Sequence, residues 1–501
     1  GNMASVESRN VYTWANCIFL LFQALAWNGY CDEFEESIKK LETLENDKTL
    51  ADIVFVALTQ SEGYHANRAK AFQKHFIDQI KHLEKENRPL LYLSHRKWSD
   101  IGTWTLFPLL TIFSEKFSKK SWFFICEEET RIDLPKLRRL LQQFNSTQDL
   151  FLGKPLRDQE PTIIHHFTDP KLFTYPDPAA GFILSYPLVK KLADRLPGTD
   201  FRIDFNIDPK HELAKYIYQD GNGLKMTEVP ELCAGNENAQ CVTSYPVKFP
   251  DCGKPVKDGD FFIAVKTCEK YHKDRVSVVK NTWGKETENI EYYSHVEEPS
   301  IPTIDLGVPN TEHGHCGKTL AIMKRFINNP KTSQIPWLVI ADDDTIISIK
   351  RLKQLLACYD SSGMLAVGER YGYNVASGKG YPYITGGGGM IFSNKMAKKF
   401  VAECPCPRDD SPDDMILGMC LKRFGIPVTH TPYLHQARPN DYSVDFLSHQ
   451  IPVSFHKHWM NDPYKVYQML QDHDEGKTSS DDDKNVDTLK DRSQSDSRDE
   501  L

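Results

Sequence analysis

The sequence predicts an α/β protein of two tandem domains, of which the first is a degenerate copy of the second. Short apolar runs, typical of buried strands, alternate along the chain with segments of helical periodicity. This alternation favours largely parallel sheets. The same order of elements occurs twice, with several matching positions 215 residues apart. A chain of 501 residues is also long enough for two or three domains.

The N-terminus has the features of a secretory signal. No charged residue occurs between Val11 and Cys31, and Ala24-Leu25-Ala26 has the small-x-small form of a cleavage site. We interpret residues 1–26 as a signal peptide, followed by a charged segment at residues 27–49. The alternative is an uncleaved signal anchor, because the uncharged run is just long enough to span a bilayer.

The C-terminus carries a matching retrieval signal. Its last four residues resemble the endoplasmic-reticulum signal Lys-Asp-Glu-Leu, with arginine in place of lysine, and end an acidic tail at residues 472–501. We therefore expect the protein in the lumen of the endoplasmic reticulum, either soluble after signal cleavage or anchored as a single-pass type II protein. A retrieval receptor is an expected partner. The four signal residues are Arg498, Asp499, Glu500 and Leu501.

The composition fits this compartment. The lumen is oxidising, so most of the twelve cysteines are expected to form disulfides. Asn145-Ser-Thr is an N-glycosylation sequon and predicts an exposed loop. The net charge of −8 gives no electrostatic reason to expect a nucleic-acid partner.

The strands are predicted from apolar runs rich in β-branched and aromatic residues. In the first half they are Ile53–Ala57, Leu90–Leu93 and Trp122–Cys126. In the second half they are Phe261–Val265 and Trp337–Ile340. After the last of these strands, Thr345–Ser348 are expected to begin an amphipathic helix whose apolar face holds Leu352, Leu355 and Leu356.

The two halves match position by position at the 215-residue offset. Trp122 corresponds to Trp337, and Glu127–Thr130 correspond to Asp342–Thr345. We infer a first domain at residues 50–232, a cysteine-containing linker at 233–257 and a second domain at 258–471. The alternative is a chance resemblance between strand–turn–helix units. The matching helical leucines are Leu137, Leu140 and Leu141 with Leu352, Leu355 and Leu356.

The copies differ where chemistry is expected. The first has glutamates where the second has aspartates, and the longer side chain would not hold a metal in the same geometry. Matching Leu213 to Leu417 places Lys210 opposite Asp414. A lysine charged at neutral pH cannot act as a carboxylate base. The hypothesis is that the first domain is non-catalytic and serves folding, acceptor binding or both.

Three consecutive aspartates, Asp342, Asp343 and Asp344, follow the strand at Trp337–Ile340. Carboxylates at the C-terminal edge of an α/β sheet lie where such sheets bind ligands. Oxygen ligands suit Mg²⁺ or Mn²⁺, which are commonly shared with a substrate diphosphate. The alternative is a solvated acidic turn that caps the next helix.

Other polar and glycine-rich positions accompany the aspartates. Lys266 and Thr267 end a strand and are placed to contact a nucleotide, and Arg275 follows in a helical pattern with Trp283. Four glycines, Gly386–Gly389, allow close approach of the backbone to a ligand. The alternatives are an ordinary strand–helix unit and a hairpin turn.

Two further motifs complete the candidate site. Asp414 lies at the start of an apolar helix, where a carboxylate is stabilised as an anion and is able to accept a proton from a hydroxyl. A capping role is the alternative. His456 and His458 alternate on a predicted strand and would face the same side, toward a metal. Histidines in such a pair are more often ordinary surface or core residues.

Taken together, these motifs resemble the fringe-type and core 1-type β-1,3-glycosyltransferases over most of residues 258–460. The duplicated architecture, the retrieval tail, Gly368–Gly372 and Phe455–Trp459 are most similar to members that glucosylate O-linked fucose on thrombospondin type 1 repeats. The resemblance implies two tandem GT-A-like (Rossmann-like) domains, UDP-glucose as donor, Mn²⁺ or Mg²⁺ as cofactor and inversion at the anomeric carbon. Fucosylated repeat proteins are the implied acceptors.

The resemblance also implies roles for individual residues. Asp344 and His456 would bind the metal, Asp342 would ligate it or contact the nucleotide sugar, and Asp414 would be the catalytic base. Asp342 stands where other members often have glutamate, and His458 has no clear counterpart. The implied donor-binding residues are Lys266, Thr267, Arg275, Asp343, Gly386, Gly387 and Gly388.

The implied reaction is a single displacement at the anomeric carbon. One alternative is the same fold with another donor, such as a galactosyl- or N-acetylglucosaminyltransferase. A second is a non-catalytic lumenal lectin or folding factor, which the set of aspartates and histidine disfavours. A glycoside hydrolase needs two carboxylates but no metal set, so it ranks last.

Overall fold

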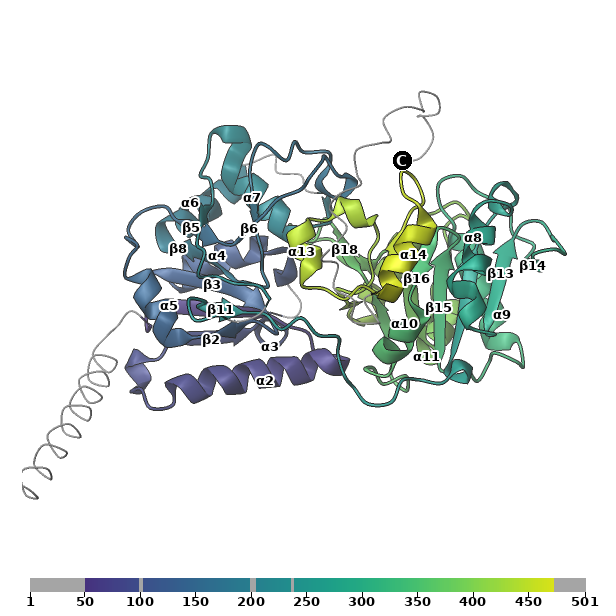
Figure 1. Cartoon of the computed structure of the whole chain (residues 1–501), viewed down its shortest axis with the longest axis horizontal. Helices are drawn as coiled ribbons and strands as arrows, with labels where there is room; N and C mark the ends of the chain where they lie inside the picture. The colour runs from purple at the N-terminus through teal and green to yellow at the C-terminus, as the bar shows by residue number, and fades with distance from the viewer. Residues whose placement is uncertain (1–49, 99–101, 199–203, 236–237, 473–501) are drawn as a thin grey trace, which may run out of the picture.

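The computed structural model describes residues 50–98, 102–198, 204–235 and 238–472. The expected signal peptide, the charged segment at 27–49 and the retrieval signal lie outside these residues. Among the described residues, no helix is both long and apolar enough to cross a membrane. Two mixed, mainly parallel sheets form the α/β fold, one in each half of the chain (Figure 1).

The first sheet has six strands in the order β2-β1-β3-β8-β5-β10. Its strands β1, β2 and β3 are parallel, and β8 runs antiparallel to both of its neighbours. They are β1 (Ile53–Leu58), β2 (Leu90–Leu93), β3 (Trp122–Glu127), β5 (Phe151–Gly153), β8 (Phe182–Ser185) and β10 (Thr227–Glu228).

The second sheet has seven strands in the order β14-β13-β12-β15-β20-β17-β21. From β13 to β21 it repeats the order and the strand directions of the first sheet. They are β12 (Phe261–Lys266), β13 (Ile290–Ser294), β14 (Thr303–Asp305), β15 (Trp337–Asp342), β17 (Ala366–Gly368), β20 (Met390–Ser393) and β21 (Thr429–His430).

Helices cover both faces of each sheet, because central strands such as β1 and β12 are apolar and buried on both sides. In the first half, α2 and α5 pack on one face, and α4, α6 and α7 on the other. In the second half, α8 and α10 pack on one face, and α9, α11 and α12 on the other. The helices of the first half are α2 (Gly63–Ile80), α3 (Ser94–Lys97), α4 (Phe107–Lys116), α5 (Leu134–Leu141), α6 (Tyr186–Arg195) and α7 (Pro209–Tyr218). Those of the second half are α8 (Arg275–Asn281), α9 (Cys316–Asn328), α10 (Ile349–Leu356), α11 (Asn394–Glu403), α12 (Asp413–Phe424), α13 (Val444–Ser448) and α14 (Pro463–Asp472).

One expectation about local structure is wrong. Residues Thr345–Ile347 form a short strand, β16, and helix α10 begins only at Ile349, with Ser348 as its cap. The β-branched residues of β16 pair antiparallel with β22 (Ser454–His456). Residues 345–348 fit the helical pattern of the leucines that follow them, but the long-range pairing with β22 determines the structure of the first three.

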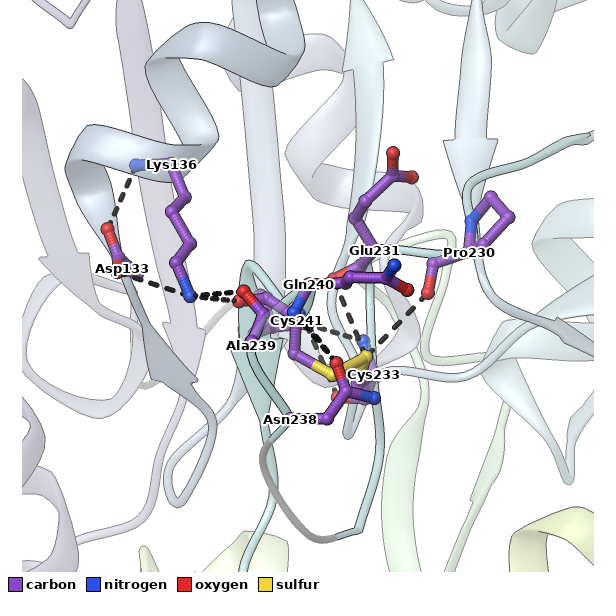
Figure 2. Close-up of a disulfide and its surroundings, with 10 residues drawn as sticks. Asp133, Lys136, Pro230, Glu231, Cys233, Asn238, Ala239, Gln240 and Cys241 are labelled. Atoms are coloured by element: carbon purple, nitrogen blue, oxygen red, sulfur yellow. Dashed lines mark hydrogen bonds and ion pairs between the residues drawn. A yellow bond between two sulfur atoms is a disulfide. The ribbon is translucent and has the colours of Figure 1, made fainter.

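In each half, one basic side chain in the first turn of a helix, α5 or α10, donates hydrogen bonds to backbone carbonyls of a segment much later in the chain. In the first half, β4 (Arg131–Ile132) pairs with β11 (Thr243–Ser244), which lies in the segment expected as a linker. Lys136 Nζ donates to the carbonyls of Ala239 and Cys241, each at 3.1 Å, inside the loop closed by the Cys233–Cys241 disulfide (Figure 2). In the second half, the buried guanidinium of Arg351 donates to the carbonyls of Pro452 and Leu470.

Hydrogen bonds and a shared sheet join the two halves. Strand β9 (Phe205–Asn206) of the first half pairs with β18 (Arg370–Tyr373) of the second, which also pairs with β19 (Tyr381–Ile384). Gln60 exchanges two hydrogen bonds with the backbone of His430, at 2.7 and 2.9 Å. A small hairpin of β6 (Pro155–Leu156) and β7 (Tyr175–Pro176) completes the fold of the first half.

Most of the described cysteines are in disulfides, as expected for an oxidising compartment. Besides Cys233–Cys241, the pairs are Cys252–Cys358, Cys316–Cys406 and Cys404–Cys420. The last two tie the loop that precedes α12 to the start of α9 and to α12 itself. Cys126 and Cys268 are free thiols among the described residues.

Arg351 provides the first test of this architecture. Arg351→Met leaves the carbonyls of Pro452 and Leu470 without a charged donor, and should lower the free energy of unfolding by about 3 kcal/mol. The measurement is urea denaturation followed by tryptophan fluorescence. Lys398→Met at an exposed position of α11 is the control, with an expected change within about 0.5 kcal/mol. Equal midpoints for the two variants would contradict the role given to Arg351.

Candidate active site

The three aspartates lie in the turn between β15 and β16, at the C-terminal edge of the second sheet. Asp342 is the last residue of β15 and is paired in register with Lys266 on β12. The hydroxyl of Thr345 accepts a hydrogen bond from the Asp342 N–H and donates to the Gly387 carbonyl. These two bonds hold the turn tightly against the glycine-rich loop.

His456 joins the aspartates because β22 pairs with β16, which sets His456 opposite Thr345. Its Nε2 lies 3.0 Å from Asp344 Oδ1 and 3.7 Å from Asp342 Oδ2. Its Nδ1 donates to the Gln436 carbonyl at 2.9 Å, which leaves Nε2 directed at the carboxylates. One ligand atom each from Asp342, Asp344 and His456 lies within 4.8 Å of the others. Two carboxylates and an imidazole are a suitable donor set for Mn²⁺ or Mg²⁺.

The glycine run is required by this geometry. A Cβ on Gly387 would lie 2.2 Å from Nδ1 of His456, so any side chain there would displace the imidazole. A Cβ on Gly386 would lie 3.9 Å from both Lys266 Nζ and Asp342 Oδ2, so Gly386 borders the cluster. Gln436 Oε1 accepts from the N–H groups of Gly387 and Gly388 and fixes the loop.

Positive side chains balance the aspartates. Arg275 Nη1 lies 2.9 Å from Asp344 Oδ2 and 3.3 Å from Asp343 Oδ1, while the Thr267 hydroxyl donates to Asp343 at 2.7 Å. Burial alone would raise the pKa of Asp344, but His456 and Arg275 outweigh burial and hold that pKa below its usual value. Burial, followed by the charge of Asp344, raises the pKa of Asp343 to about 7.

Lys266 connects the aspartate turn with the start of α12. Its Nζ lies 3.1 Å from Asp342 Oδ1 and 2.8 Å from Asp413 Oδ2. The Thr319 hydroxyl also donates to Asp413, at 2.6 Å. The roles of Asp413 and Thr319 were not predicted. The sequence signal for Asp413 was present in its position beside Asp414, whereas nothing near Thr319 in the sequence indicated its contact.

Asp414 is the second residue of α12, and its carboxylate has no cationic partner in an ion pair among the described residues. Burial, followed by the charge of Asp413, raises the pKa of Asp414 to about 7. Burial also opposes ionisation of Asp413, but the ammonium of Lys266 keeps its pKa at about 2. Two adjacent carboxylates therefore have different proton affinities, an arrangement suited to acid–base chemistry.

His458 does not share the position of His456. The backbone of Lys457 has a φ of 77°, which ends the strand alternation between the two histidines. Burial lowers the pKa of His458 to about 4, so its imidazole is neutral at physiological pH. Its Nε2 is buried without a hydrogen-bond partner in the described part of the chain.

The expected sequon residue, Asn145, is exposed in a turn after α5.

The corresponding edge of the first sheet has a different set of residues. Glu128 lies 2.5 Å from His65 Nδ1, and Glu129 lies 2.9 Å from Arg68, both partners being on α2. Lys210 is the second residue of α7, the position that Asp414 has in α12. Continuing the β4–β11 pairing by one residue sets Tyr245 opposite Thr130, where the second half has His456 opposite Thr345.

The pattern of the Fringe-like family matches residues 110–222 and 256–478. The chain belongs to the Fringe-like family. It is 49% identical over 460 residues to a β-1,3-glucosyltransferase of Homo sapiens, covering 89% of this chain and 92% of that protein. It is 51% identical over 427 residues to a β-1,3-glucosyltransferase of Mus musculus, covering 84% and 87%. The β-1,3-N-acetylglucosaminyltransferase manic fringe of Danio rerio is 26% identical over 210 residues, which cover 37% of this chain and 58% of that protein. The expected enzyme class, a β-1,3-glycosyltransferase, is thereby confirmed.

The ion pair of Lys266 gives a second prediction. Lys266→Met leaves Asp413 buried and without its cation, and should lower the free energy of unfolding by about 3–5 kcal/mol. Urea denaturation measures the change, with the exposed Lys273→Met as control. The double variant Lys266→Met/Asp413→Asn should recover part of the loss, because it removes the uncompensated charge. A double variant as unstable as the sum of its parts would show that the ion pair is not the cause.

Proposed function

We propose that the chain transfers glucose from UDP-glucose to the 3-hydroxyl of O-linked fucose on thrombospondin type 1 repeats, with inversion at the anomeric carbon. The observation that carries this proposal is the cluster of Asp342, Asp344 and His456 beside Asp414, in a chain about half identical to β-1,3-glucosyltransferases. The lectin alternative gives no reason for a carboxylate–imidazole cluster of this kind.

Each residue of the cluster has a proposed role. Asp344, His456 and Asp342 would hold Mn²⁺ or Mg²⁺, which when bound there neutralises charge on a leaving diphosphate. Arg275, Lys266 and the backbone of Gly386–Gly388 border the same edge and are proposed to contact the donor, with Thr267 orienting Asp343 for the same purpose.

Asp414 is proposed as the general base. Its carboxylate accepts the proton of the acceptor hydroxyl while that oxygen attacks the anomeric carbon from the face opposite UDP. The neighbouring Asp413 forms an ion pair with Lys266 and stays deprotonated. It therefore positions α12 and takes no proton. Among the described residues, Asp414 thus differs from its neighbour in having no cationic partner in an ion pair.

We also infer that the two halves descend from one GT-A-like domain, with residues 50–232 non-catalytic and residues 258–471 catalytic. Ser185 and Ser393 support this inference, because they make the same pair of contacts. Each hydroxyl donates to a backbone carbonyl, of Gln148 or Gly363, and accepts an N–H two residues further along. Entry into the secretory pathway and retrieval to the endoplasmic reticulum remain proposals from the sequence.

The decisive assay measures UDP release with Mn²⁺ and a fucosylated thrombospondin repeat. UDP-glucose should support turnover, and UDP-galactose and UDP-N-acetylglucosamine should not. Asp414→Asn should lower kcat by about 10²-fold or more while leaving UDP binding unchanged. The exposed Asp410→Asn is the matched control. Near-normal turnover of Asp414→Asn would disprove the base, and turnover with another donor would disprove the donor.

The pH dependence follows from the raised pKa of Asp414. Only the deprotonated carboxylate accepts a proton, so activity should be low when pH is below the pKa and should level off above it. With a pKa of about 7, kcat/KM should rise between pH 6 and pH 8. Initial rates across this range, with circular dichroism to confirm folding, test the expectation. A flat profile would show that Asp414 titrates outside the range or does not limit the rate.

A further inference from the structure

A cavity of about 680 Å³ lies between the two halves of the chain. Its floor is the C-terminal edge of the first sheet, where β1, β2 and β3 end in parallel. Residues 58–60 end β1 and follow it, Ser94 and His95 follow β2, Glu127 ends β3 and Glu128 follows it, and residues 208–210 form the start of α7 with its cap. This is the edge that corresponds, strand by strand, to the candidate active site of the second half.

The second half covers this edge. Residues 369–371 around β18 and residues 427–430 around β21 line the opposite side of the cavity. None of Asp342, Asp344, Asp414 and His456 lines it. The exposed residues Ser61, Gly378 and Lys422 also line it, so the cavity reaches the surface. It is therefore separate from the candidate active site.

The lining lacks the means to bind a diphosphate in the way proposed for the second half. Tyr245 occupies the position of His456 and Lys210 that of Asp414. Glu128 is engaged by His65, and Lys210 lies 2.7 Å from Asp208. A ligand with two or more negative charges would face buried carboxylates without a metal set to offset them.

Several polar groups of the lining are nevertheless without partners. Among the described residues, the buried atoms Glu128 Oε2, Asp208 Oδ1, Arg370 Nε and Thr429 Oγ1 make no hydrogen bond. Such groups are rare in native proteins and call for a ligand or ordered water. The guanidinium of Arg370 stacks on the Trp104 ring at 4.3 Å, and both residues line the cavity.

We propose that this cavity binds an uncharged saccharide of one or two rings without a metal. Sugar hydroxyls both donate and accept, so they match a lining that mixes carboxylates, a guanidinium and a threonine hydroxyl. The half-buried Trp104 offers an aromatic surface for the apolar side of a sugar ring. The volume lies within the range of about 300–1,000 Å³ typical of small-molecule sites.

The ionisation of the lining agrees with an uncharged ligand. Burial raises the pKa of Glu127 to about 7 and that of Glu369 to about 8, so both carboxyls are partly protonated near neutral pH and able to donate hydrogen bonds. Burial, with no carboxylate among the causes, lowers the pKa of Arg370 to about 9. These shifts support the proposal, which stands on the cavity and its unpartnered groups.

The test is saturation-transfer-difference NMR on the full chain, with UDP and Mg²⁺ present to fill the candidate active site. The probes are methyl glycosides of glucose, galactose, fucose and N-acetylglucosamine, the disaccharides lactose and maltose, and glucuronate as a charged comparison. At least one neutral sugar should show saturation transfer that falls five-fold or more in both Arg370→Met and Trp104→Leu. Asp414→Asn should leave the transfer unchanged.

Four results would overturn the proposal. Three of them are no transfer to any neutral sugar, transfer in Arg370→Met and Trp104→Leu as strong as in the unsubstituted protein, and stronger transfer to glucuronate than to the neutral sugars. Transfer that Asp414→Asn abolishes would place the sugar in the candidate active site instead. Matching thermal midpoints of the variants would exclude unfolding as the cause of a loss.

A kinetic arm, which rests on the proposed function, separates two sources of the saccharide. If the sugar belongs to the acceptor glycoprotein, Arg370→Met should raise KM for the fucosylated repeat about five-fold and leave KM for a methyl fucoside unchanged. If it is a free sugar, both KM values should stay unchanged. Failure of turnover with either acceptor would concern the proposed function alone, because the NMR measurement does not depend on transfer.

Discussion

The antiparallel pairing of β16 with β22 is the contact on which the candidate active site depends. It brings His456 to within hydrogen-bond distance of Asp344, although 112 residues separate them in the sequence. Thr345 serves the same turn through its hydroxyl, and Gly387 leaves room for the imidazole. Arg351 then fastens the C-terminal segment that carries β22 to helix α10. The geometry of the site thus depends jointly on the β16–β22 pairing, the aspartate turn, the glycine-rich loop and the C-terminal segment.

Features that are local in the sequence were predicted correctly. Apolar runs located β1, β3, β12 and β15, and the shared offset located α5 and α10, since both depend on the order of neighbouring residues. Features that depend on pairing with residues far away in the sequence were not predicted. Thr345–Ser348 continues a helical pattern yet its first three residues form a strand, because β22 supplies hydrogen bonds that the local pattern does not reveal. Tyr245 was missed for the same reason, as its correspondence to His456 depends on the β4–β11 register.

Charge distribution, rather than residue type, separates the roles of neighbouring aspartates. Asp413 and Asp414 are adjacent, but only Asp413 reaches Lys266 and Thr319. The ion pair stabilises the charged form of Asp413, and burial followed by that fixed negative charge raises the pKa of Asp414. Sequence alone assigned a base to this motif from its resemblance. The structure adds the electrostatic reason why one carboxylate of the pair is suited to receive a proton near neutral pH.

The same reasoning explains how one sheet edge can be covered and its counterpart can remain a candidate metal site. In the first half, Arg68 and Lys210 form ion pairs with Glu129 and Asp208, and His65 hydrogen-bonds Glu128, so protein side chains engage these carboxylates where the second half has a candidate metal site. With Glu128, Glu129 and Asp208 each engaged by a partner side chain, the second half packs over the edge through β18 and His430. A cluster of carboxylates that needs a metal and an anionic donor requires access for both. In the first half the engaged carboxylates and the covered edge therefore occur together, and the polar cavity between the two halves favours a neutral ligand.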